Sequence, residues 1–99
     1  MADNDAPHAW QLRVGQKLRM VNEIDDSVIF NDCSGETHLV SAIAVSLLEQ
    51  LSTRPADFLT ISTALEKTWE FDSRKELQHT VHELLGELEE LGLIQAWRT

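Results

Sequence analysis

Four side chains able to bind a metal or to catalyse a reaction lie within seven residues of each other, at Asp32, Cys33, Glu36 and His38. A structural zinc site is commonly built on a pair of closely spaced cysteines and needs a full set of ligands. This chain contains one cysteine, and Gly35 stands between it and the imidazole. The segment is therefore interpreted as a turn flanked by polar residues, and no metal site is predicted.

Two pairs of reactive residues suggest other chemistry. Cys33 and His38 would act as nucleophile and base only in hydrogen-bond contact, with a third group that orients the base. His79 and His82 stand three residues apart in a predicted helix, on neighbouring rows from which both could reach one metal ion. The sequence offers neither an oxyanion-type glycine-rich loop nor a matching set of ligands. We predict that the protein is not an enzyme and needs no cofactor.

The first half of the chain shows the β-prone, alternating pattern typical of strands. Turn residues interrupt it at Asp25–Asp26 and at Gly35, which can take a positive φ. Trp10 and Leu12 are expected to pack onto the resulting sheet as an anchor. The pattern predicts an antiparallel meander of three strands, at Lys17–Ile24, Ser27–Asn31 and Thr37–Ser41.

The second half changes to helical spacing. A helix is predicted over Ala42–Leu51, with Ser41 as its N-cap, and Pro55 prevents it from continuing. A shorter helix is predicted over Thr60–Thr68, capped by Thr60 itself.

The third helix has the clearest boundaries, because Ser73 and Glu76 form a capping box and Gly92 can end the helix in a left-handed conformation. It is predicted over Ser73–Leu91, and Leu93–Trp97 is expected to follow as a short extended tail. One apolar stripe runs along the helix, formed by Leu77, Val81, Leu84, Leu85, Leu88 and Leu91.

These elements predict a small α+β domain in the order β-β-β-α-α-α. A three-stranded antiparallel sheet precedes three helices in a winged-helix-like arrangement with the wing placed first. Residues 1–9 are expected to form a loose polar tail and residues 10–99 the domain. The chain start lacks a secretory signal pattern, so a cytoplasmic location is expected.

The net charge of −9 arises from 17 acidic and 8 basic residues, and acids exceed bases in both halves of the chain. A protein that binds phosphates needs a basic face, so neither nucleic acid nor an anionic membrane is expected as a partner. A neutral or basic peptide would be attracted. The acidic surplus is equally well explained as a means of keeping the domain soluble.

The third predicted strand is of interest for its backbone, because an edge strand carries unpaired N–H and C=O groups that natural proteins normally protect. Thr37–Ser41 contains neither proline nor lysine for that purpose. By alternation, Thr37, Leu39 and Ser41 share one face, and His38 and Val40 share the other. We expect this edge to accept a strand from another chain.

The sequence resembles the PqqD-like family, most closely the branch described as HPr-rel-A system PqqD family peptide chaperones. The resemblance extends from Trp10 to nearly the end of the chain. Its most specific part is Ser34–Val40, "SGETHLV". A less specific leucine-rich ending includes Leu85, Leu88 and Gly92–Ile94.

The resemblance implies a RiPP recognition element, which is a non-catalytic domain that binds the leader of a short ribosomal precursor peptide and presents it to a modifying enzyme. In such domains the peptide adds to the third strand and lies against the third helix. The implied binding strand here is Thr37, His38, Leu39, Val40 and Ser41. On the helix, a helical wheel favours Gln78, Val81, His82 and Leu85.

Two other functions stay open at the level of sequence. A winged-helix transcription regulator would have the same helical half, although its recognition helix would be rich in glutamate and poor in arginine. A homodimer that pairs the exposed strand with its own copy would need only the open edge.

Overall fold

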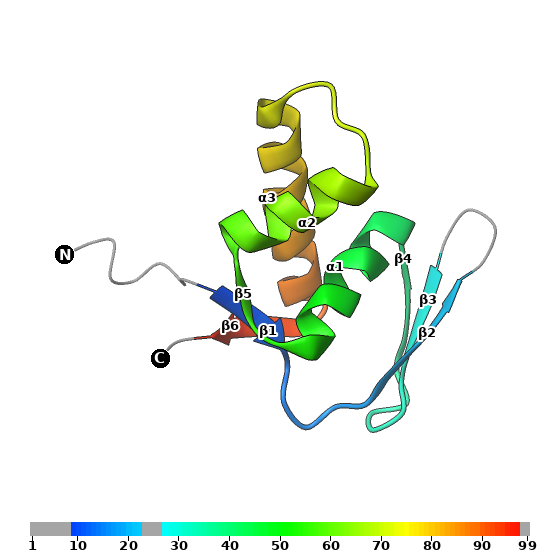
Figure 1. The fold of residues 1–99 in the computed structure, drawn as a ribbon. Coiled ribbons are helices and arrows are strands. Elements are labelled where there is room, and N and C mark those ends of the chain that lie inside the picture. The colour runs from blue at the N-terminus through cyan, green and yellow to red at the C-terminus, as the bar shows by residue number, and fades with distance from the viewer. Residues whose placement is uncertain (1–8, 23–26, 98–99) are drawn as a thin grey trace.

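The computed structural model describes residues 9–22 and 27–97, so the predicted turn at Asp25–Asp26 and residues 1–8 of the predicted tail lie outside it. The described fold is α+β, as predicted, with two three-stranded antiparallel sheets and three helices (Figure 1). Its strands are β1 (Ala9–Leu12), β2 (Leu18–Asn22), β3 (Ser27–Asn31), β4 (Thr37–Val40), β5 (Ala56–Asp57) and β6 (Ile94–Trp97). Its helices are α1 (Ala42–Thr53), α2 (Phe58–Thr68) and α3 (Arg74–Glu90).

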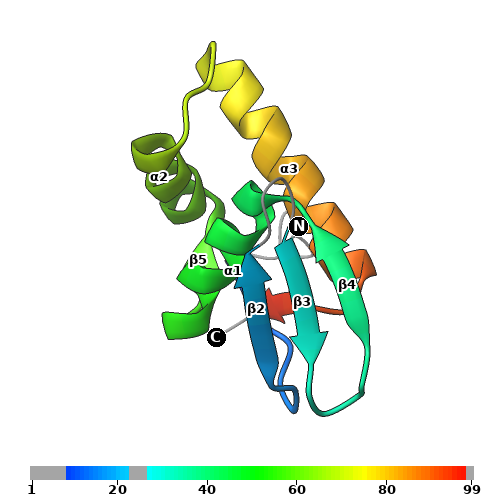
Figure 2. The same ribbon diagram turned by 90° about the vertical axis from the view of Figure 1, so that its right-hand side faces the viewer.

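The predicted meander is present as a sheet in the order β2-β3-β4. Ile29, at the centre of β3, is fully buried and pairs with Met20 on β2 and with His38 on β4. Side chains alternate between the two faces of a sheet, so these three residues share the inward face. Figure 2 shows α1 and α3 behind that face of the sheet.

A second sheet, in the order β5-β1-β6, joins segments from both ends of the chain with a short strand from its middle. The predicted order β-β-β-α-α-α is wrong in lacking these three strands, which precede β2, separate α1 from α2 and follow α3. Trp10 and Leu12, expected as an anchor, belong to its central strand, where they pair with Ala96 and Ile94. Ala9 is buried and begins β1, so the prediction that it ends a loose tail is wrong at this residue. The extended tail after α3 is therefore a strand that closes the fold.

The first two helices begin at capping side chains. The Ser41 hydroxyl accepts a hydrogen bond of 3.3 Å from the Ala44 N–H, as predicted. The predicted cap of α2 is wrong, because Asp57 takes that place and its carboxylate accepts the Thr60 N–H at 2.7 Å. A charged oxygen is the stronger acceptor, and Thr60 therefore lies inside the helix.

Both ends of α3 follow from the sequence. The Ser73 hydroxyl accepts the Glu76 N–H at 3.1 Å, and Gly92 has a φ of +79°. The Leu93 N–H donates to the Leu88 carbonyl at 3.0 Å, which is the bond expected of a glycine-terminated helix. This ending turns the chain from α3 into β6.

The core lies where α1 and α3 meet the two sheets, and α1 lies between the sheets (Figure 1). Five of the six residues in the predicted α3 stripe are buried, and Leu91 is partly buried. Leu47 and Leu48 of α1, Ile61 of α2 and Ile94 of β6 are at most 2% exposed. The leucine stripe is thus mainly core.

Candidate functional site

β4 forms one edge of its sheet, and within residues 9–22 and 27–97 no strand pairs with its outer side (Figure 2). The opposite edge, β2, differs in charge, because Lys17 precedes it and Arg19 lies within it. Positive side chains are a common means of protecting an edge strand. The edge at β4 has no lysine, arginine or proline, so it is the better template for an added strand.

The register shows which backbone groups of β4 are open. The Asn31 N–H donates to the Glu36 carbonyl at 2.8 Å, and the same ladder pairs Ile29 with His38. In an antiparallel pair the hydrogen-bonding residues alternate. His38 therefore directs its N–H and C=O toward β3, and Thr37 and Leu39 direct theirs outward.

Side-chain exposure along β4 follows the predicted alternation. Leu39 is 67% exposed, whereas Val40 is 3% exposed. Leu39 pairs with Val28, which pairs in turn with Val21 on β2. These three residues form an apolar row across the outward face of the sheet, here called the outer row.

The reactive side chains before β4 are turned to separate partners. The Asp32 carboxylate forms an ion pair of 3.2 Å with the Arg19 guanidinium, which also lies 4.5 Å from the centre of the Phe30 ring. The Ser34 hydroxyl lies 3.3 Å from Glu36, and Cys33 is exposed. Among the described residues, no three His, Cys, Asp or Glu side chains form a group that could hold a metal ion. The segment is a turn, and Gly35 takes its predicted positive φ, +80°.

His38 faces inward, and its side chain is 16% exposed. In the described structure its Nε2 atom is buried and has no hydrogen-bond partner. The nearest carboxylate oxygen, on Glu36, is 3.9 Å away, which is within ion-pair range but too long for a hydrogen bond. The imidazole therefore has unused hydrogen-bonding capacity beside the open edge.

A buried asparagine positions the hairpin, and the sequence reasoning missed it. Asn31 is 7% exposed, and its side-chain oxygen accepts the N–H groups of Cys33 and Ser34 at 3.0 and 3.3 Å. Its amide group donates to Gln16, which donates to the Leu93 carbonyl at 2.8 Å. The local half of this network has a sequence signal, an asparagine before turn residues. The half that reaches Leu93 has none.

The four predicted α3 residues lie in two settings. Val81 and Leu85 are 0% and 3% exposed and belong to the core. Gln78 and His82 are exposed, and the His82 ring lies 4.4 Å from the ring of Phe58 at the start of α2. This side of α3 thus faces α2, and a role for these residues in peptide binding stays a prediction.

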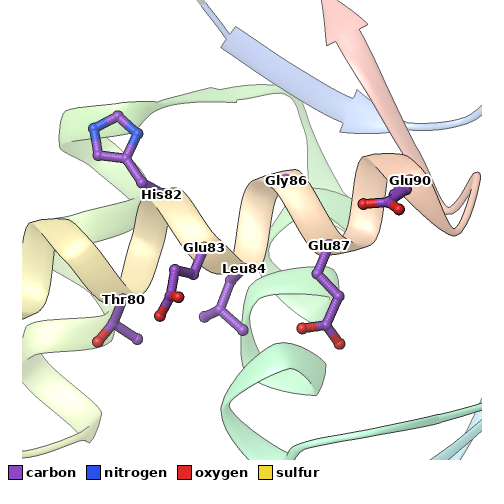
Figure 3. A pocket seen from close by; sticks show the side chains of 7 residues that line it. All are labelled: Thr80, His82, Glu83, Leu84, Gly86, Glu87 and Glu90. Carbon is purple, nitrogen blue, oxygen red and sulfur yellow. The ribbon is translucent and has the colours of Figure 1, made fainter.

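The other side of α3 carries Thr80, Leu84 and Glu87, each about one helical turn from the next, here called the α3 flank. Figure 3 shows these side chains pointing toward α1, while His82 points to the opposite side. Leu84 is 7% exposed and Thr80 is partly buried. An open depression of about 480 Å³ runs along this helix, lined by Thr80, His82, Glu83, Leu84, Gly86, Glu87 and Glu90.

The charges on α3 are unevenly distributed. Its basic residues, Arg74 and Lys75, open the helix, and no basic residue lies in its last turn. Glu83 lies 3.3 Å from His79, whereas the His82 ring lies against Phe58, so the two histidines have different partners. The C-terminal end of a helix carries a partial negative charge, so Glu87 and Glu90 add to a field that is already negative.

In comparisons with known proteins, no family model, no curated protein and no solved structure matches the chain.

Proposed function

We propose that the protein is a non-catalytic peptide chaperone or adaptor, which binds an extended peptide as a fourth strand along β4 and presents it to a modifying enzyme. The observation that supports this function best is the pair of outward-directed backbone positions, Thr37 and Leu39, on an edge without proline or lysine. Main-chain hydrogen bonds would supply affinity, and side-chain surfaces on either face would supply selectivity.

The resemblance to PqqD-like proteins supports the same function, because Ser34–Val40 covers the turn and most of the open strand. We propose a ribosomally made precursor peptide as the cargo and the cytoplasm as the place of binding. Within the described ranges, none of the helices combines the length and apolar character required to cross a membrane.

A strand added to β4 would place alternate side chains on the face where α1 and α3 lie. The helix surface that such a strand meets is proposed to be the α3 flank, Thr80, Leu84 and Glu87, rather than the side that carries Gln78 and His82. The ring of His82 already packs against Phe58, whereas the α3 flank points toward α1 (Figure 3).

The test is an NMR titration of the labelled protein with the short peptide encoded beside its gene. Shifts are expected at Thr37–Ser41 and along the α3 flank. Leu39→Pro removes one outward N–H group, and the loss of about one hydrogen bond predicts roughly tenfold weaker binding. Leu39→Thr is the control, because it keeps the N–H group and the strand propensity. Val40 is unsuited to this test, since it is 3% exposed and its backbone faces β3.

An unchanged affinity in Leu39→Pro, with the amide spectrum of an intact sheet, would argue against strand addition. A loss of affinity in Leu39→Thr equal to that in Leu39→Pro would assign the effect to the side chain instead of the backbone.

The open edge also supports a second candidate, a homodimer that pairs β4 with its own copy, since Leu39 would be covered in such a pair. Light scattering over a range of concentrations separates the two functions, because a dimer through β4 would dissociate in Leu39→Pro. No observation of the same kind favours DNA binding, since the last turn of α3 contains no basic residue.

A further inference from the structure

We infer that the peptide bound along β4 alternates apolar and basic residues, with an apolar side chain opposite Leu39 and a lysine or arginine on each side of it. The inference rests on the proposed function, and it names the chemical class of the cargo. It follows from the difference between the two faces that a fourth strand would meet.

The outward face of the β2-β3-β4 sheet favours an apolar residue on the added strand. Val21, Val28 and Leu39 are aligned across three strands by the register, and Leu39 is the most exposed of them, at 67%. A residue directly opposite Leu39 on an added strand lies on the same face, close enough for side-chain contact. An apolar side chain there would extend the outer row and cover Leu39.

Acidic side chains border the inward face of the sheet beside β4. The neighbouring residues of the added strand point to the side of α1 and α3, where the α3 flank ends in Glu87. Glu36 enters the same face from the start of β4, since it alternates in phase with His38 and lies 3.9 Å from it. Lysine and arginine fit this surface, because their long aliphatic stems can lie along the α3 flank while their charged ends reach carboxylates.

The carboxylates of Glu83, Glu87 and Glu90 oppose the stability of the helix that carries them. Glu83 and Glu87 are four residues apart, and Glu87 and Glu90 are three apart, so each pair places like charges side by side. The last two lie in the helix turn where the macrodipole disfavours anions. A basic partner relieves this repulsion, and charge complementarity therefore favours a basic cargo over a neutral or acidic one.

The experiment is selection from a library of random peptides displayed on phage, with the full-length protein immobilised. One variant removes three charges from α3, as Glu83→Gln, Glu87→Gln and Glu90→Gln. A matched variant removes three charges elsewhere, at the exposed positions Glu49, Glu66 and Glu70, and therefore has the same net charge. Leu39→Pro is the fourth target.

The wild-type protein and the matched variant are expected to select peptides in which lysine or arginine flanks an apolar residue at alternate positions. The α3 variant is expected to lose this preference, and its affinity for a peptide selected by the wild-type protein should fall roughly tenfold. Equal basic enrichment on both charge variants would overturn the inference, because net charge alone would then explain it. Wild-type peptides without alternating basic residues would overturn it as well.

The fourth target separates failure of the inference from failure of the proposed function. If Leu39→Pro selects nothing while the wild-type protein selects non-basic peptides, strand addition stands and the charge rule is wrong. If Leu39→Pro selects the same peptides as the wild-type protein, or the wild-type protein selects none, the proposed function itself is wrong.

Discussion

β4 and β6 are both four-residue strands at the edge of a three-stranded sheet, but they differ in what they bury. β6 begins with Ile94, which is 2% exposed. It follows directly on Leu93, whose N–H is hydrogen-bonded to the last turns of α3. β4 carries Leu39, which is 67% exposed. Each strand thus buries one apolar residue, Ile94 on β6 and Val40 on β4, but β4 also turns the large apolar side chain of Leu39 outward, where a partner could cover it.

The comparison predicts its largest effect at Ile94. Ile94→Ala removes buried methyl and methylene groups and leaves a cavity, and it should lower the free energy of unfolding by about 2–5 kcal/mol. Leu39→Ala, the matched truncation on β4, should change it by less than about 0.5 kcal/mol. Urea unfolding followed by circular dichroism measures both. Equal losses in the two variants would show that Leu39 contributes as much to stability as Ile94 and is not kept for a partner.

The sequence predicts β3, β4, α1 and α3 well because each has a local cause. β-Branched and aromatic residues mark β3, and the capping side chains Ser41 and Ser73 mark α1 and α3. The second sheet has no comparable signal. β5 has two residues, and β1 pairs with β6 across nearly the whole chain. Pairing between such distant segments depends on how the whole chain folds around the core, and a local sequence pattern carries no signal for it.

The candidate site divides in the same way. The alternation of Leu39 and Val40 follows from strand geometry alone, and the structure has it. A helical wheel separates the buried stripe of α3 from its surface, but it does not say which exposed side faces another element. His82 lies against Phe58, and Glu87 points toward α1. This difference is set by how the helices pack.

A medium effect is predicted at Asp57, which belongs to β5 and caps α2. The hydrogen bond from the Thr60 N–H holds the pKa of the Asp57 carboxyl below its ordinary value of 3.8. Asp57→Ala should cost about 1 kcal/mol at neutral pH. Because the folded pKa is lowered, this contribution is present above 3.8 and is lost as the pH falls through the folded pKa.

The control at this position is Asp57→Ser, which keeps an oxygen acceptor but cannot titrate. Its difference in unfolding free energy from Asp57→Ala should be independent of pH, whereas the difference between wild type and Asp57→Ala should shrink in acid. A wild-type difference that stays constant down to about pH 2 would show that the capping bond does not depend on the charge.

The smallest effect tests whether the acidic end of α3 is kept for binding or for stability. Glu87→Gln removes a charge that the helix dipole and two neighbouring glutamates disfavour, so it should raise the free energy of unfolding by about 0.3–1 kcal/mol at low salt. Glu76→Gln, in the first turn of the same helix, should lower it, because the dipole favours an anion there. Both effects should diminish in high salt. Thermal unfolding at two salt concentrations measures them. If Glu87→Gln destabilises the helix and leaves peptide affinity unchanged, the acidic end of α3 stabilises the fold and does not bind the peptide. The binding role proposed for the β4 edge would then not include α3.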